Sequence, residues 1–280
     1  MLVQYIHPYL NLSDRIIHLE NLGLTIPNKA VAEKVISEIG FSRFKIYSSA
    51  FMSKNEQFRP RTNFYHVRAV YELDIRLRKH LMTALEIIEI YLRSAWVDAI
   101  TFRYGPLVHT DPTKFQYQAK WQKNKDKLDE EWQKTTDKLL AIYRAKYIEP
   151  PIWFAVHAMS FGTLSKWIAI SPADVLKDLM QRFQVQGLQS FVSAVQALTI
   201  LRNHCAHYSR IWNNQFPVAF PSYSSMVGPS ISSKKVASAI NLIAHFLTQV
   251  DSRKAQSWIS DMNEMIKNLP PWQRKLMGFA

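Results

Sequence analysis

Residues 198–216, LTILRNHCAHYSRIWNNQF, gather groups that could do chemistry: the only cysteine of the chain, two of its nine histidines and two arginines. An imidazole titrates near neutral pH, so it can take a proton from a ribose 2′-hydroxyl and help protonate the leaving 5′-oxygen. A guanidinium can hold the scissile phosphate with two hydrogen bonds and stabilise the charge that develops there. An asparagine beside them can orient either group. This set suits RNA cleavage without a metal, whereas DNA, which lacks the 2′-hydroxyl, would resist it.

A helical projection sorts these residues onto two sides. At 100° per residue, one side holds the polar residues Gln196, Thr199, Asn203, His207 and Arg210, with Arg202 at its edge. The opposite side is an apolar seam of Ala194, Leu198, Leu201, Cys205, Tyr208 and Trp212. The seam predicts a buried, structural cysteine, and the polar side offers a candidate site. A surface helix also sorts its residues this way, although exposed faces usually carry Lys, Glu and Gln.

Other chemistries fit the stretch less well. Cys205 and His207 cannot act as a nucleophile pair, because residues two apart on a helix point away from each other. His204 and His207 would give zinc only two ligands, and no CxxC or HExxH motif accompanies them. The chain also lacks the GxxxxGK[ST] and GxGxxG loops that cradle nucleotides. We therefore expect no metal and no cofactor.

The spacing of arginine and histidine is not specific by itself. Arg61 and His66 have the same separation as Arg202 and His207, and they lie in an unrelated part of the sequence. We treat this second match as a coincidence. It shows that the spacing alone does not identify a site, which must be assigned from the longer sequence around the motif.

The elements that must position these residues are helices. Gly is scarce, and Leu, Ile, Ala, Lys and Gln are frequent, which favours helices over strands. We predict a helix in the segment that begins at Asn28, ending near Gly40, and further helices over 64–102 as one helix or two, over 189–213 and over 234–250. The 64–102 segment carries a stripe of apolar residues that should be buried: Leu73, Leu77, Leu81, Leu85, Ile88 and Leu92.

Further helical signals lie between these segments. The polar, Lys-rich segment 113–147 should be helical and solvated, and local ion pairs should form around its DKLDEE block. Ser171 should cap another helix whose first residue is Pro172. The Pro- and Ser-rich stretch 220–233 reads as a loop. The sequence therefore predicts an all-α fold.

Charge and composition restrict the partners. A net charge of +13 attracts polyanions, of which nucleic acid is the commonest. One cysteine gives no internal disulfide, the N-terminus lacks a secretory signal, and no apolar run is long enough to span a bilayer. We expect a soluble, cytoplasmic protein that binds RNA and does not associate with a membrane.

The amino-acid sequence around the motif resembles that of a known family. LRNHCAHYSRIWNNQF is similar to the signature of the Abi-like (AbiD/AbiF-type) bacterial abortive-infection family, within the HEPN superfamily. Three further blocks resemble the family in the same order: GLTIPNKAVAEKVISEIGFSRFKIYSSAF, YELDIRLRKHLMTALEIIEIYLRSAW and PPIWFAVHAMSFGTLSKW. The resemblance implies a HEPN-like helical bundle at residues 61–280, with an N-terminal helical segment at 1–60 packed on it.

The resemblance also implies roles for residues. HEPN nucleases carry an Arg-polar-x3-His pattern, which Arg202, Asn203 and His207 match as catalytic residues. His204, Arg210, Glu89 and Arg93 are then candidate RNA-binding or supporting residues. Two copies usually form one composite site, so a homodimer is expected. Glu86, Glu89 and Arg93 share a helical spacing that allows them to flank the site, although an internal ion pair is the favoured interpretation.

One residue departs from the family pattern. We expect a glutamate within the PPIW…SFG block, where this chain has His157. If that glutamate helps to build the site in relatives, its role is open in this chain.

Three functions remain in competition. The first is a metal-independent endoribonuclease toxin of an abortive-infection or toxin–antitoxin system, acting on host or phage RNA. The second is a catalytically silent RNA-binding module, and the third is a protein-interaction component of a defence system. An antitoxin could be RNA or protein, and the positive charge favours RNA.

Overall fold

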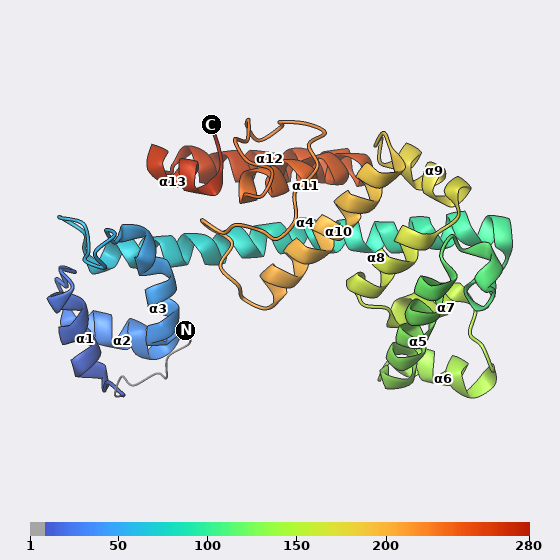
Figure 1. The fold of residues 1–280 in the computed structure, drawn as a ribbon, viewed down its shortest axis with the longest axis horizontal. Coiled ribbons are helices and arrows are strands. Elements are labelled where there is room, and N and C mark those ends of the chain that lie inside the picture. Colours follow the sequence, from blue (N-terminus) through green and yellow to red (C-terminus); the bar gives the residue numbers. More distant parts are fainter. Residues whose placement is uncertain (1–8) are drawn as a thin grey trace. The chain divides into compact units, whose positions relative to one another are not determined.

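The fold consists of α-helices joined by loops (Figure 1). The computed structural model describes residues 9–280, and across these residues it contains no β-strand. The predicted all-α helical bundle is confirmed. The chain divides into two compact units, of which the first ends at Leu77 and the second runs from Arg78 to Ala280.

The first unit is built from short helices and the beginning of a long one. Its elements are α1 (Leu12–Asn21), α2 (Lys29–Ile39), α3 (Phe41–Ser48), the 3₁₀ turn η1 (Ser49–Phe51) and the start of α4 (Phe64–Tyr104). Helix α2 ends where predicted, because Gly40 follows it with φ = 84°, a conformation that glycine adopts without strain. A buried hydrogen bond of 2.6 Å, from the Tyr47 hydroxyl to Asp74, ties α3 to α4 within this unit.

The segment predicted as one helix or two is one continuous helix. Helix α4 has 41 residues and ends at Tyr104, directly before Gly105 with φ = 82°. All six residues of the predicted apolar stripe, from Leu73 to Leu92, are at most 2% exposed. The periodicity of three and four therefore identified the buried face correctly.

The second unit contains the rest of α4 and nine further helices among its residues. They are α5 (Gln118–Lys134), α6 (Lys138–Lys146), α7 (Ile152–Ala158), α8 (Phe161–Ile170), α9 (Ala173–Arg182), α10 (Leu188–Ala206), α11 (Val236–Val250), α12 (Ser252–Lys267) and α13 (Pro271–Met277). The 3₁₀ turns η2 (Val108–Thr110) and η3 (Pro112–Lys114) precede α5. Helices α11 and α12 pack on each other, and so do α8 and α10.

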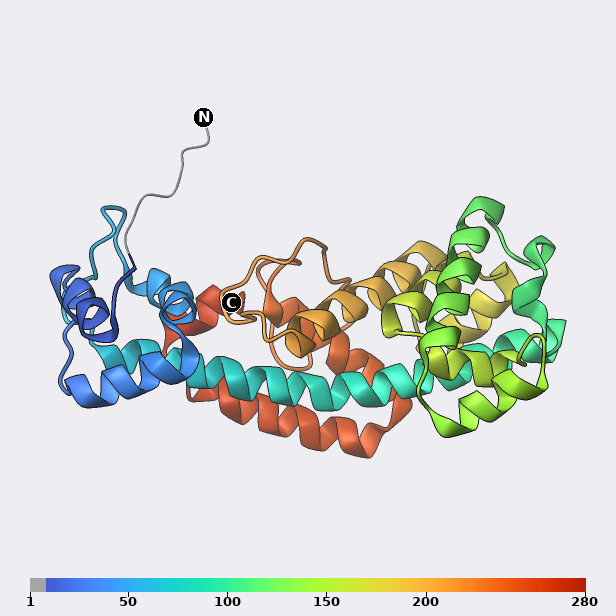
Figure 2. The ribbon, with the colours of Figure 1, turned by 90° about the horizontal axis from the view of Figure 1, so that it is seen from below.

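Helix α12 lies along α4 in the second unit (Figure 2). The Trp258 ring stacks on the His80 ring with centroids 5.0 Å apart, and its Nε1 donates to the His80 carbonyl at 2.9 Å. This contact combines apolar burial with a satisfied indole N–H. Across the described residues, no helix combines the length and apolar character that crossing a membrane would require.

Two local predictions have different outcomes. The ion pairs expected around the DKLDEE block are present, with Lys127 and Lys134 both pairing with Glu130. The prediction that Ser171 caps a helix beginning at Pro172 was wrong, since α9 begins at Ala173. Ser171 is fully buried, where its hydroxyl accepts from Trp96 Nε1 at 2.9 Å and donates to the Trp167 carbonyl at 2.8 Å. The Ser171 hydroxyl therefore satisfies the buried indole N–H of Trp96 and does not cap α9.

Candidate functional site

Helix α10 carries the motif and ends earlier than predicted. We expected a helix to residue 213, but α10 stops at Ala206 with His207 as its C-cap. Tyr208 then takes a left-handed conformation with φ = 58°. Its N–H donates to the Cys205 carbonyl at 3.2 Å, and the Ser209 N–H donates to the His204 carbonyl at 2.9 Å. This pair of hydrogen bonds defines a Schellman motif, so His207 and Arg210 do not lie on the helix.

The early end corrects part of the helical projection. Cys205 and Leu201 are buried as predicted, at 4% and 0% exposure. Tyr208, placed in the apolar seam, is instead 69% exposed, because the chain has already left the helix. Thr199, placed on the polar side, is buried, and its hydroxyl donates to the Val195 carbonyl at 3.0 Å. A threonine can satisfy its hydroxyl within its own helix and so tolerates burial.

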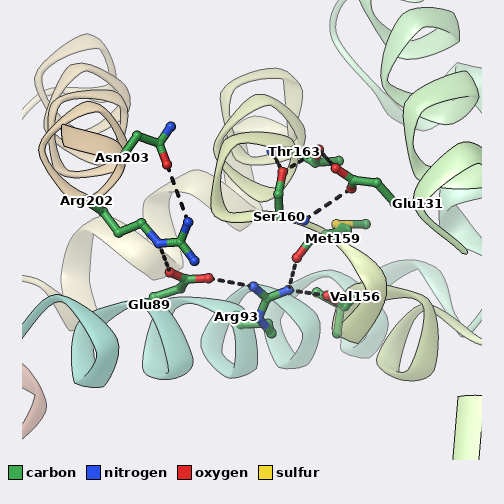
Figure 3. Close-up of polar contacts among 9 residues, drawn as sticks. All are labelled: Glu89, Arg93, Glu131, Val156, Met159, Ser160, Thr163, Arg202 and Asn203. Atoms are coloured by element: carbon green, nitrogen blue, oxygen red, sulfur yellow. Dashed lines mark hydrogen bonds and ion pairs between the residues drawn. The ribbon is translucent and has the colours of Figure 1, made fainter. Parts of the chain in front are cut away.

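Glu89 joins two arginines into one cluster (Figure 3). Its Oε1 lies 2.9 Å from Arg93 Nη2 on the same helix, and its Oε2 lies 3.4 Å from Arg202 Nε on α10. The ion pair between Glu89 and Arg93 was expected from their spacing and is confirmed. Glu89 and Arg93 are nearly buried, with side chains 14% and 13% exposed, whereas that of Arg202 is 33% exposed.

Arg93 is fixed by the end of α7. Its Nη1 donates to the backbone carbonyls of Val156 and Met159, the second at 3.0 Å. These carbonyls lie at the C-terminal end of α7, where helix carbonyls carry partial negative charge, and the Val156 carbonyl also accepts from the Met159 N–H. The guanidinium is thus held by two helices, and it holds Glu89 in turn. Arg93 therefore fixes the orientation of the Glu89 carboxylate that contacts Arg202.

The cluster keeps a net positive charge. Two guanidinium groups share one carboxylate, so one positive charge is left uncompensated by side chains of the cluster. The more exposed member, Arg202, also directs Nη1 toward the Asn203 amide oxygen at 3.4 Å, a long and weak contact. The Arg202 side of the cluster is therefore suited to an anion that approaches from solvent.

His207 is exposed at the end of α10. Its backbone N–H donates to the Asn203 carbonyl at 2.9 Å, which ties it to the residue that touches Arg202. Within residues 9–280, the structure shows no hydrogen bond or ion pair between the His207 side chain and the Glu89 cluster. The structure thus brings together Arg202, Asn203, Glu89 and Arg93, with His207 adjacent in the chain.

His204 and Arg210 have other neighbours in the structure. His204 Nδ1 is 2.9 Å from the Ile200 carbonyl, and since a carbonyl only accepts, Nδ1 carries the proton. The His204 ring also packs against Phe216, with centroids 5.2 Å apart. Arg210 lies near Lys235, where burial and then the charge of Arg210 lower the pKa of the lysine. His204 is therefore held as part of the packing, and Arg210 belongs to a second basic position.

His157, the departure from the family pattern, faces Arg93. Burial and, secondarily, the positive charge of Arg93 lower the pKa of His157 below its usual range. An imidazole stands where a glutamate was expected, so this position supplies no negative charge to Arg93. Glu89 is the carboxylate that does so, while Glu86, at a related spacing, is exposed.

Glu131 is a structural anchor that the sequence analysis missed. Its carboxylate accepts from the Ser160 N–H at 3.1 Å and from the Thr163 hydroxyl at 2.9 Å, which fixes the beginning of α8 (Figure 3). We assigned the surrounding block to local ion pairs. The signal that could have found it is the SxxT sequence at 160–163, in which the Ser160 hydroxyl caps α8 by accepting from the Thr163 N–H. Position 163 is not the Glu or Gln that would accept from the Ser160 N–H in a capping box, so another acceptor had to be found elsewhere in the chain.

Within residues 9–280, the structure shows no group of three His, Cys, Asp or Glu side chains arranged as metal ligands.

The comparisons with known proteins bear on the whole of this site. The sequence profile of the Abi-like protein family matches residues 34–213, which is more than half of the chain. The chain belongs to the Abi-like family. No curated protein and no solved structure matches it. The matched segment of this Abi-like protein contains every candidate residue from Glu89 to Arg210.

Proposed function

We propose that this Abi-like protein is a metal-independent endoribonuclease of a bacterial abortive-infection or toxin–antitoxin system. Family membership fits a role in abortive infection. The observation that carries the nuclease proposal is the arrangement at the end of α10. Arg202 is oriented by Glu89 and touches Asn203, and the exposed His207 follows at the helix terminus.

Each residue has a role in the proposed reaction. His207 removes the proton from a ribose 2′-hydroxyl, and the 2′-oxygen attacks the adjacent phosphorus. Arg202 holds the non-bridging oxygens as negative charge builds on them, and Asn203 helps to orient the phosphate. The bond from phosphorus to the 5′-oxygen breaks, and that oxygen receives a proton. The products are a 2′,3′-cyclic phosphate and a free 5′-hydroxyl.

One chain supplies one motif histidine, His207, whereas the reaction needs both a base and an acid. We propose that a second copy of the chain contributes the other group, so that a homodimer forms one composite site. The RNA that is cut would be of host or phage origin. The net positive charge of the protein would attract this polyanion.

The decisive experiment is cleavage of labelled single-stranded RNA in the presence of EDTA. The wild-type protein should cut and leave 2′,3′-cyclic ends, and His207→Ala should lower the rate by about 100- to 10,000-fold. The same RNA with a 2′-deoxy sugar at the cleaved position should resist.

Arg61 and His66 provide a matched control, since they repeat the spacing of Arg202 and His207 outside the site. His66→Ala should cut at the wild-type rate. If wild-type and His207→Ala proteins bind RNA equally and neither cuts it, the nuclease proposal is wrong and an RNA-binding module remains. Absence of any salt-sensitive RNA affinity would leave the protein-interaction role.

A further inference from the structure

One peptide group between α7 and α8 lies between two charged side chains (Figure 3). The carbonyl of Met159 accepts from Arg93 Nη1 at 3.0 Å. The N–H of the next residue, Ser160, donates to Glu131 Oε2 at 3.1 Å. This carbonyl and this N–H belong to the same planar group, and in a trans peptide they point in opposite directions. The Met159–Ser160 peptide is therefore held at both ends, by α4 on one side and by α5 on the other.

The two charges suit the polarity of that peptide group. A peptide N–H carries a partial positive charge and here faces the carboxylate of Glu131, whereas the carbonyl carries a partial negative charge and faces the guanidinium of Arg93. Hydrogen bonds to charged groups are about twice as strong as neutral ones. Each of the two also polarises the peptide in the sense that strengthens the other. The orientation of this peptide is thus fixed more firmly than a single neutral hydrogen bond would fix it.

Glu131 is itself held at the beginning of α8. Its Oε1 accepts from the Thr163 hydroxyl at 2.9 Å, and Thr163 is 3% exposed. The Thr163 N–H donates to the Ser160 hydroxyl at 3.2 Å, so the same turn of the chain is closed a second time. The adjacent residue on α5 behaves differently, because Glu130 pairs with two exposed lysines. Of these two neighbouring glutamates, Glu131 is the one that contacts the start of α8.

From this peptide the contacts continue to Arg202. Arg93 uses Nη1 for the Met159 carbonyl and Nη2 for Glu89 Oε1 at 2.9 Å. Glu89 Oε2 lies 3.4 Å from Arg202 Nε. The connecting groups are largely withdrawn from water, since Met159 is buried and the side chains of Arg93 and Glu89 are nearly so. Salt therefore screens these contacts little.

We infer that Glu131 is a positioning residue for Arg202. It fixes the Met159–Ser160 peptide, and that peptide fixes Arg93, on which the orientation of Glu89 depends. This inference rests on the proposed nuclease function for what Arg202 does to a phosphate. Without the Glu131 carboxylate, one end of the peptide is released, and the guanidinium of Arg202 gains a wider range of orientations.

The kinetic effect of this loss should fall on one constant. Arg202 stabilises charge that builds up in the transition state of the proposed reaction, so a more loosely held Arg202 lowers kcat. The attraction of RNA comes from charges distributed over the whole chain, so KM changes little.

The first test measures kcat and KM for labelled single-stranded RNA. Glu131→Ala should lower kcat by about ten-fold and leave KM nearly unchanged. Glu131→Gln should recover most of the rate, because its amide oxygen can accept from the Ser160 N–H while its amide nitrogen donates to the Thr163 hydroxyl oxygen. Glu130→Ala is the matched control on the adjacent residue and should cut as the wild type does. A wild-type kcat in Glu131→Ala would contradict the inference.

Thr163→Val separates the anchoring of α8 from the link to Arg202. It removes the hydroxyl that binds Glu131 but leaves the Ser160 N–H and its acceptor in place. Its melting temperature should fall because a buried hydrogen bond is lost, whereas its kcat should stay close to that of the wild type. Equal losses of kcat in Thr163→Val and Glu131→Ala would show that Glu131 acts only on α8, and the inference would be wrong.

The second test does not depend on cleavage. In protein labelled with ¹⁵N-arginine, the order parameter of the Arg202 Nε–H bond reports how firmly the guanidinium is held. The signal is identified by its loss in Arg202→Lys. Its order parameter should fall in Glu131→Ala and stay unchanged in Glu130→Ala, and no change in Glu131→Ala would overturn the inference. The expected fall in a protein that cuts no RNA would support the link to Arg202 and overturn the nuclease proposal alone.

Discussion

Glu89 has a double contact that explains how the site is held before any substrate arrives. Its carboxylate faces Arg93, which is nearly buried, and Arg202, which is partly open to solvent. Removing one partner from a nearly buried ion pair leaves an uncompensated charge, which costs more than the pair contributes. We therefore regard Glu89 as a positioning residue for Arg202.

Glu89→Gln should lower the free energy of unfolding by about 1–3 kcal/mol, measured in urea, because two guanidinium groups then lack their carboxylate. Cleavage should fall on the order of ten- to one-hundred-fold, because Arg202 loses its orientation. Glu130 provides the control, since it also bridges two cations but lies on the surface of α5. Glu130→Gln should leave stability and cleavage unchanged. Equal effects of the two substitutions would contradict the positioning role.

The sequence could predict some contacts of the site and not others. The ion pair between Glu89 and Arg93 follows from a spacing of four on one helix. The contact of Glu89 with Arg202 depends on how α10 crosses α4, which no local pattern encodes. The hydrogen bonds from Arg93 to the Val156 and Met159 carbonyls could not be predicted either. Every residue has a backbone carbonyl, so the residue types do not indicate which of them lies near Arg93.

At the scale of elements, periodicity located α2, α4, α10 and α11, while α1, α12 and α13 were not predicted. Sequence signals also missed where α9 begins and where α10 ends. The apolar stripe of α4 and the stop at Gly40 have direct local causes. Helix α10 ends without a glycine, so its apolar periodicity suggested a longer helix that runs past Tyr208. Ser171 looked like a cap but was required by Trp96 in the core. For Ser171, a tertiary requirement outweighed a local preference.

The packing of η2 against α5 buries a histidine that should make stability depend on pH. His109 is 1% exposed, and neither ring nitrogen has a hydrogen-bond partner among the described residues. Glu149 Oε2 is 3.9 Å from its Nε2, too far for a hydrogen bond. Burial and, secondarily, the charge of Lys125 lower the pKa of His109 to about 4.

This lowered pKa fixes the sign of the effect. Between pH 6.5 and pH 4 the unfolded chain binds a proton at His109 that the folded chain does not, so stability falls as the pH falls through this window. The loss should total about 3 kcal/mol. His109→Phe should remove this slope from urea unfolding measured across the window, with little change at pH 7. A slope that is unchanged in His109→Phe would show that other groups cause it.

At the scale of the whole molecule, the proposed composite site can be tested by mixing wild-type and His207→Ala chains. In that site, His207 of one copy acts as base and the same residue of the second copy acts as acid, so a mixed dimer lacks one of the two groups. After exchange in an equal mixture, about half of the dimers are mixed and about a quarter are wild type in both chains. Cleavage by the mixture should therefore fall to about a quarter of the rate of the same total amount of wild-type protein. A rate of one half, together with a monomeric protein in sedimentation, would exclude the composite site.

The carboxylate of Glu89 has a consequence for the thermodynamics of the proposed RNA binding. Nucleic-acid affinity falls with salt because binding releases ions, chiefly the cations that accompany the phosphates and also anions dissolved around exposed protein cations. Arg202 already holds an anion that is part of the chain. When a phosphate takes that place, Glu89 keeps its ion pair with Arg93, and Arg202 returns no dissolved anion to the solvent. In the proposed complex, the contact of Arg202 should therefore weaken less steeply with salt than the contacts of exposed, unpaired lysines and arginines.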